Sequence, residues 1–156
     1  MKKVLIALDY DPTAQKVAEM GYAMAKANLS EVTLLHITAD PVFYAYPEYS
    51  PIMGYNPYGE VGSFQDSNLE GLNKAAYSFL NKTRHHLGDE NIKTMVVDGD
   101  IADTILETIK KGNFNVAVLG THSGKWLEDI LMGSVATKVL HHSQIPLYII
   151  PTRKHK

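Results

Sequence analysis

Short apolar runs alternate with amphipathic stretches along the whole chain. The runs lack regular polar alternation, which is typical of strands buried on both faces of a sheet. Between the runs, apolar residues recur at helical spacing. The expected strands are Val4–Leu8, Val32–Ile37, Lys93–Val97, Asn115–Leu119 and Leu147–Ile150.

Four helices are expected between these strands. Asp11 followed by Pro12 predicts an N-cap with proline at the first helical position. The stripe of small apolar residues that follows would let this helix lie close against a sheet. A second N-cap is predicted at Asp100, with Asp103 three residues later. The other two helices are expected at about Asp66–Leu87 and at Val135–His142.

Strict alternation of strand and helix predicts an α/β fold: an open, five-stranded parallel sheet, Rossmann-like, with helices on both faces. In such sheets, ligands bind beyond the carboxyl ends of the strands, where the strand order reverses. The functional loops are therefore expected after the first, second and fourth strands.

One long segment interrupts the alternation of strands and helices. Residues 40–65 hold most of the tyrosines and prolines of the chain. Loops of this length are functional or disordered in most proteins, and the aromatic side chains argue against simple disorder. A lid over a ligand, a partner-binding arm and a flap packed on its own domain all fit the segment.

Composition narrows the class of protein. The chain has 156 residues, a net charge of −2 and no cysteine, which excludes disulfides and thiolate metal sites. A slightly negative net charge does not favour binding to nucleic acid or to an anionic membrane. Basic residues are concentrated only in a short tail, residues 152–156. No run approaches the roughly 20 apolar residues that span a bilayer. The N-terminus does not resemble a signal peptide, so a cytoplasmic location is expected.

The loop from Gly120 to Ser134 joins a buried strand to a helix and carries glycine at both ends. It does not fit a P-loop, because Gly120 and Gly124 enclose three residues and Trp126 follows Lys125. Two interpretations remain. The glycines allow the backbone to turn, or they let free amides at a helix N-terminus approach a phosphate.

The chain resembles the universal stress protein family over residues 1–151, as a single domain. The resemblance rests on VLIALD, LLHI, Gly99-Asp100-Ile101-Ala102 and above all VAVLGTH…LMGSVATKVLHHSQIPLYIIP. It implies a fold like that of the adenine nucleotide alpha hydrolases. The nucleotide-binding branch has glycine, two residues, glycine, nine residues, glycine, then serine or threonine. Here that pattern meets Gly120, Ser123, Gly133 and Ser134, so serine replaces the second glycine.

The effect of Ser123 on phosphate binding depends on the backbone conformation that the pattern needs at this position. If this position needs positive φ, serine costs on the order of 1 kcal/mol or more. If it needs only a nearby N–H, serine serves and adds a hydroxyl. The resemblance further implies that Asp9 contacts the ribose and that the Ile37 backbone pairs with adenine, whereas Asp9 would otherwise cap a turn. The nucleotide-binding residues implied are Ala7, Asp9, Ile37, Gly120, Thr121, His122, Ser123, Gly133, Ser134 and Val135.

The resemblance implies a stress-response regulator that binds ATP or another adenine nucleotide, with or without Mg²⁺. The fifth strand is expected at an edge of the sheet, and the resemblance implies a homodimer formed through it. No general base stands beside a nucleophile, so dedicated catalysis is not predicted. No metal site is expected either, although pairs such as His85-His86 occur. The alternative is a nucleotide-free dimer that acts on protein partners through residues 40–65.

Overall fold

The structure is a computed structural model that describes residues 1–38, 69–121 and 132–152. The Tyr/Pro-rich segment, two of the expected nucleotide contacts (His122 and Ser123) and the basic residues 153–156 lie outside the described residues. Thr152, assigned by the sequence to the tail, is 5% exposed and so packs with the folded chain.

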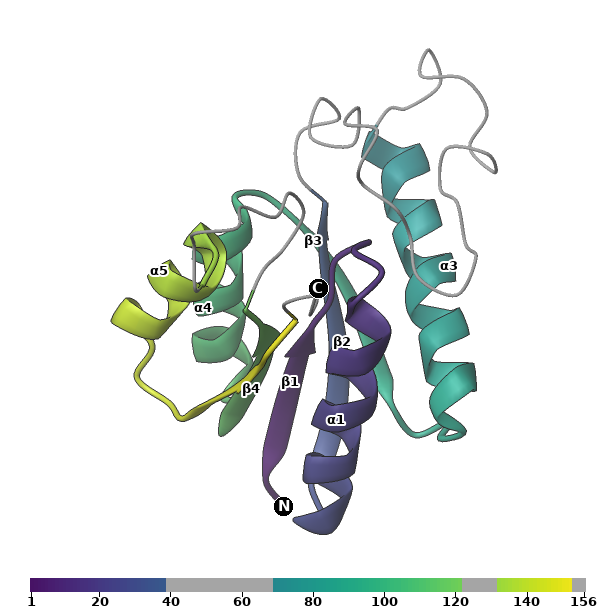
Figure 1. Cartoon of the computed structure of the whole chain (residues 1–156). Helices are drawn as coiled ribbons and strands as arrows, with labels where there is room; N and C mark the ends of the chain where they lie inside the picture. The colour runs from purple at the N-terminus through teal and green to yellow at the C-terminus, as the bar shows by residue number, and fades with distance from the viewer. Residues whose placement is uncertain (39–68, 122–131, 153–156) are drawn as a thin grey trace, which may run out of the picture.

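Five parallel strands form one sheet in the described chain (Figure 1). Their order is β3-β2-β1-β4-β5, which confirms the predicted open parallel sheet. β5 lies at one edge, as expected, and β3 lies at the other. The strands are β1 (Lys3–Ala7), β2 (Glu31–Thr38), β3 (Lys93–Asp98), β4 (Val116–Gly120) and β5 (Leu147–Ile150).

Helices cover both faces of the sheet (Figure 1). α1 (Ala14–Ala27) and α3 (Leu69–Leu87) pack on one face around a core that includes Ile6, Leu34 and Phe79. α4 (Ile101–Gly112) and α5 (Ser134–His142) pack on the other face around Leu5 and Leu35. Successive residues of β1 and β2 therefore enter opposite cores, because side chains alternate along a strand.

The start of α1 differs from the prediction. Asp11 is not the N-cap, because the helix begins at Ala14 and Thr13 occupies that position. The Asp11 carboxylate instead accepts hydrogen bonds from the Thr13 amide at 2.9 Å and from its hydroxyl at 2.6 Å. Aspartate readily bonds to backbone two residues ahead in a turn, and this local bond shifts the helix start by two residues.

The predicted cap of α4 is confirmed. The Asp100 carboxylate accepts the Asp103 amide at 3.0 Å. Gly99, just before it, has a φ of +141°, and a Cβ there would stand 2.7 Å from Thr104 Oγ1. Its amide also donates to the Thr38 carbonyl at 3.2 Å. Glycine thus allows the chain to leave β3 and enter α4 within two residues.

Close packing of α1 on the sheet depends on Gly21. A Cβ at this position would lie 2.9 Å from Val118 Cγ1 and 3.0 Å from Ile6 Cδ1. Both neighbours are fully buried, and valine has little rotameric freedom. The small-residue stripe read from the sequence therefore sets the distance between α1 and the centre of the sheet.

We expect Gly21→Leu to lower the free energy of unfolding by about 2 kcal/mol or more, because the side chain overfills a packed interface. Ala23→Leu is the matched control, since Ala23 is exposed on the same helix, and it should change stability by less than about 0.5 kcal/mol. Urea denaturation followed by circular dichroism measures both values. Equal stability of the two variants would contradict the packing role of Gly21.

Candidate functional site

The strand order reverses between β1 and β4. The chain passes from β1 outward through β2 to β3, then returns to the other side of β1 to form β4. Connections therefore diverge to opposite faces at the carboxyl ends of β1 and β4, which leaves a crevice there. This is the place where the sequence predicts a ligand.

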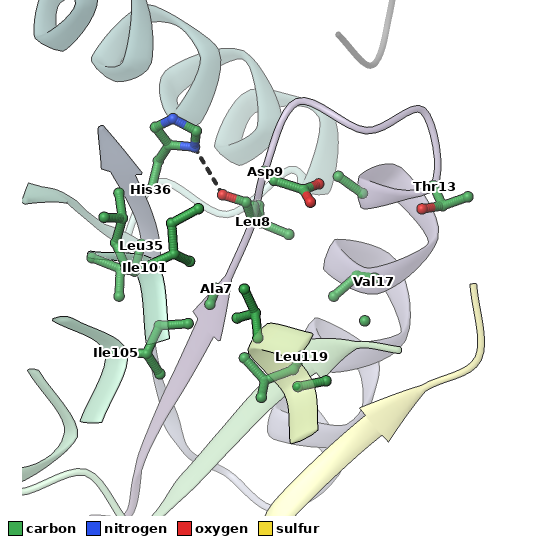
Figure 2. Close-up of a pocket in the computed structure, with 15 residues that line it drawn as sticks. Ala7, Leu8, Asp9, Thr13, Val17, Leu35, His36, Ile101, Ile105 and Leu119 are labelled. Carbon is green, nitrogen blue, oxygen red and sulfur yellow. Dashed lines mark hydrogen bonds between the residues drawn. The ribbon is translucent and has the colours of Figure 1, made fainter. Parts of the chain in front are cut away.

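A hollow occupies this crevice (Figure 2). The space within it is about 630 Å³, including the part open to solvent. In Figure 2, Leu35 and Ile105 lie on one side of β1, and Thr13 and Val17 lie on the other. The walls are mainly apolar, and the polar groups gather around the end of β1.

The hollow brings together part of the predicted site. Five of the ten expected residues line it, from four different elements or their ends: Ala7, Asp9, Ile37, Gly120 and Val135. Thr121 lies directly after β4, and Gly133 and Ser134 open α5, but these three do not line the hollow.

Thr121 and Gly133 hydrogen-bond to each other where the glycine-flanked loop begins and ends. The Gly133 amide donates to the Thr121 carbonyl at 2.6 Å, and the Thr121 amide donates to the Ile150 carbonyl at 3.0 Å. The two ends of the loop are thus joined to each other and to β5. The loop therefore begins and ends at two adjacent points beside the hollow.

The N-terminus of α5 supplies amides at the hollow. The first bond within the helix runs from the Thr137 amide to the Gly133 carbonyl at 3.0 Å, so the amides of the residues between them have no acceptor within the helix. Two of these residues, Val135 and Ala136, line the hollow. Amides that have no acceptor within the helix, together with the helix dipole, favour an anion at this position.

Asp9 has two roles in this arrangement. It lines the hollow, and its Oδ1 accepts the Asp11 amide at 3.0 Å. The turn-capping role weighed from the sequence is therefore present.

Sequence reasoning missed the α4 wall of the hollow, which consists of Ile101 and Ile105. The predicted topology could have indicated that this helix forms a wall of the hollow. α4 connects β3 at one edge of the sheet to β4 beyond β1, so it must cross over the reversal point. The first turns of this helix consequently cover the carboxyl ends of the central strands.

His36 was also missed, although its strand was predicted. His36 lines the hollow and is 2% exposed. Nδ1 lies 2.8 Å from the Leu8 carbonyl oxygen (Figure 2), and because a carbonyl only accepts, Nδ1 carries the proton. The ring also packs against Tyr10, with centroids 4.4 Å apart, and Phe79, at 5.9 Å. His36 thus links the ends of β1 and β2 across a buried aromatic cluster.

The profile of the Universal stress protein family matches residues 1–151. The chain belongs to this family. Universal stress protein A of Salmonella typhi is 24% identical over 153 residues, covering 97% of this chain and 95% of the relative. Universal stress protein MJ0577 of Methanocaldococcus jannaschii is 23% identical over 152 residues, covering 96% and 94%.

Solved structures of universal stress proteins share the fold. The structure of MJ0577 superposes with a TM-score of 0.75 at 22% identity, covering 99% of this chain and 98% of the other. UspA of Lactobacillus plantarum gives 0.73 at 17% identity, covering 96% and 97%. Three further structures contain nucleotides: one with cAMP (0.62), one from Archaeoglobus fulgidus with dAMP (0.58) and one from Arabidopsis thaliana with AMP (0.59).

The described residues hold neither a cluster of metal ligands nor a membrane-spanning helix. Among residues 1–38, 69–121 and 132–152, no three acidic or histidine side chains gather in a way that would hold a metal ion. In the same ranges, no helix combines the length and apolar character needed to cross a bilayer.

Burial makes His36 a pH-sensitive point of this universal stress protein. Removal from water lowers the pKa of His36 from 6.5 to about 4, and the bond to the Leu8 carbonyl offsets only part of that effect. In the unfolded chain the ring takes up a proton below pH 6.5, while in the folded chain it resists protonation until about pH 4. Between these values the unfolded state binds more protons, so stability falls as pH falls.

We expect the free energy of unfolding to decrease by about 3 kcal/mol more in the wild type than in His36→Asn when the pH falls from 7 to 4. Asparagine keeps a donor near the Leu8 carbonyl but does not titrate. Carboxylates titrate alike in both chains, so the difference isolates the histidine. Urea denaturation at several pH values provides the measurement, and parallel curves for the two proteins would refute the assignment.

Proposed function

We propose that this universal stress protein binds an adenine nucleotide at the carboxyl ends of β1, β2 and β4 and acts as a nucleotide-dependent regulator in the stress response. One observation carries the proposal. Asp9, Ile37 and Val135, which come from three separate parts of the chain, line a single hollow at the reversal of strand order. Family structures with cAMP, dAMP and AMP support the same ligand class.

Each part of a nucleotide has a matching feature. The apolar wall that includes Ile101 and Ile105 suits a flat purine ring, with the Ile37 backbone beside it. The Asp9 carboxylate suits the ribose hydroxyls. The free amides at the start of α5 suit a phosphate, with Gly120, Thr121, His122, Ser123, Gly133 and Ser134 assigned around it. ATP with Mg²⁺ is the proposed physiological form, and the cytoplasm the proposed location.

Calorimetric titration tests the proposal directly. We expect saturable binding of AMP and of ATP, the latter measured with and without Mg²⁺, and weaker binding of GMP, whose ring presents different groups to the Ile37 backbone. Absence of heat at high micromolar protein would refute the proposal and favour action through protein partners. If Ser123→Gly binds more tightly than the wild type, the replaced glycine limits affinity in this chain.

Asp9→Asn examines the ribose contact. Its Oδ1 can still accept the Asp11 amide, so the turn should persist while the charge is lost. We expect AMP affinity to fall about tenfold, the effect of losing one charge-assisted hydrogen bond. Asp11→Asn is the matched control, because Asp11 does not line the hollow, and it should leave affinity unchanged. The penalty of Asp9→Asn should vanish with 2′,3′-dideoxy-AMP. A penalty that persists with this ligand would place Asp9 elsewhere.

We further propose a homodimer through β5. This strand ends the sheet in the described chain, and Leu147, Tyr148 and Ile149 are each only partly buried. An apolar edge with unpaired backbone groups favours pairing with another strand, and two-fold pairing is the common arrangement. Sedimentation equilibrium should give twice the chain mass, whereas a monomer at micromolar concentration would contradict the proposal.

A further inference from the structure

The chain continues its ordered packing past the end of β5. Thr152 lies one residue beyond the stretch that matches the family profile, yet it is 5% exposed. Its amide donates to Thr121 Oγ1 at 3.0 Å, and the two hydroxyl oxygens are also 3.0 Å apart. Pro151, between β5 and Thr152, accepts a hydrogen bond from Lys16 Nζ at 2.7 Å. This segment is therefore held from two sides.

Thr121 is the other half of this contact, and all of its polar groups are engaged. Its hydroxyl meets Thr152, its amide donates to the Ile150 carbonyl, and its carbonyl accepts the Gly133 amide. Gly133 in turn is the N-cap of α5, and its carbonyl accepts both the amide and the hydroxyl of Thr137. A continuous series of hydrogen bonds thus runs from the C-terminal segment to the first turn of α5.

We propose that Thr121 and Thr152 are positioning residues for the anion site at the start of α5. The Gly133 amide is held at 2.6 Å from the Thr121 carbonyl, so the orientation of Thr121 sets the direction in which α5 begins. The hydroxyl contact with Thr152 fixes that orientation, because Thr152 is anchored through Pro151 to α1. The C-terminal segment therefore belongs to the site although it does not line the hollow.

The positioning role depends on the two hydroxyl groups, above all on the Thr121 oxygen that accepts the Thr152 amide. The Thr152 amide lies at a residue that is almost fully buried, and it uses Thr121 Oγ1 as an acceptor. A buried amide that loses its acceptor destabilises the conformation that buries it. Thr121→Val would remove the acceptor with little change in shape, so the C-terminal segment should shift to find another. Thr152→Val would remove only one hydroxyl and should have a smaller effect.

Amide hydrogen exchange measured by NMR tests the inference without a nucleotide. We expect exchange at Gly133 to become about tenfold faster in Thr121→Val and to accelerate less in Thr152→Val, because one or two hydrogen bonds are lost. Thr152→Ser keeps the hydroxyl and should behave like the wild type. Amides of β1 and α3 should be unchanged in these three variants.

Thr83→Val is the matched control. Thr83 is fully buried, and its hydroxyl donates to the Phe79 carbonyl at 3.0 Å within α3, away from the loop. It should leave exchange at Gly133 unchanged. Unchanged protection of Gly133 in both Thr121→Val and Thr152→Val would overturn the inference. So would a uniform acceleration across the sheet, since that indicates a general loss of stability.

A second arm measures AMP affinity, and it rests on the proposed function. We expect Thr121→Val to weaken AMP binding about fivefold, and the Thr121→Val/Thr152→Val double variant to bind no more weakly, because the two hydroxyls act as one unit. Full additivity, or unchanged affinity in Thr121→Val, would overturn the link to the site. If wild type fails to bind AMP, the proposed function fails, while the exchange result still decides the positioning role.

Discussion

The reversal of strand order between β1 and β4 is the constraint on which the rest of the structure depends. A parallel sheet requires crossover connections over its faces, and connections that diverge on the two sides of β1 cannot cover the same point. The carboxyl ends of β1 and β4 are therefore left open, and α4 and α5 reach them from one face while α1 reaches them from the other. The hollow is a consequence of topology before any side chain is considered.

Side chains then refine a site that the backbone has formed. Val135 and Ala136 at the start of α5 and Ile37 of β2 line the hollow. Asp9 illustrates how one residue is shared, since its carboxylate stabilises the turn after β1 while it faces the hollow. The hydrogen bond between His36 and the Leu8 carbonyl joins the ends of β1 and β2. These groups are fixed by the fold, so little ordering remains to be done when a ligand binds.

Hydrogen bonds join the two ends of the loop after β4. Its ends meet through Gly133 and Thr121, and the C-terminal segment supports them through Thr152. In this chain, serine replaces one glycine of the family pattern at position 123.

The sequence by itself determined the fold class and most strand positions, because buried parallel strands and amphipathic helices have distinct periodicities. It also identified the cap at Asp100 and, through the family pattern, five residues that line the hollow. The start of α1 needed the structure, since Asp11 and Thr13 compete for one local role and only the geometry decides between them. The structure was also needed to find three other residues of the hollow. The crossing of α4 over the sheet places Ile101 and Ile105 there, and the pairing of β1 with β2 places His36 there. The support from Thr152 arose in the same way: it joins residues 31 positions apart, and no local pattern encodes a contact made only when distant segments are packed together.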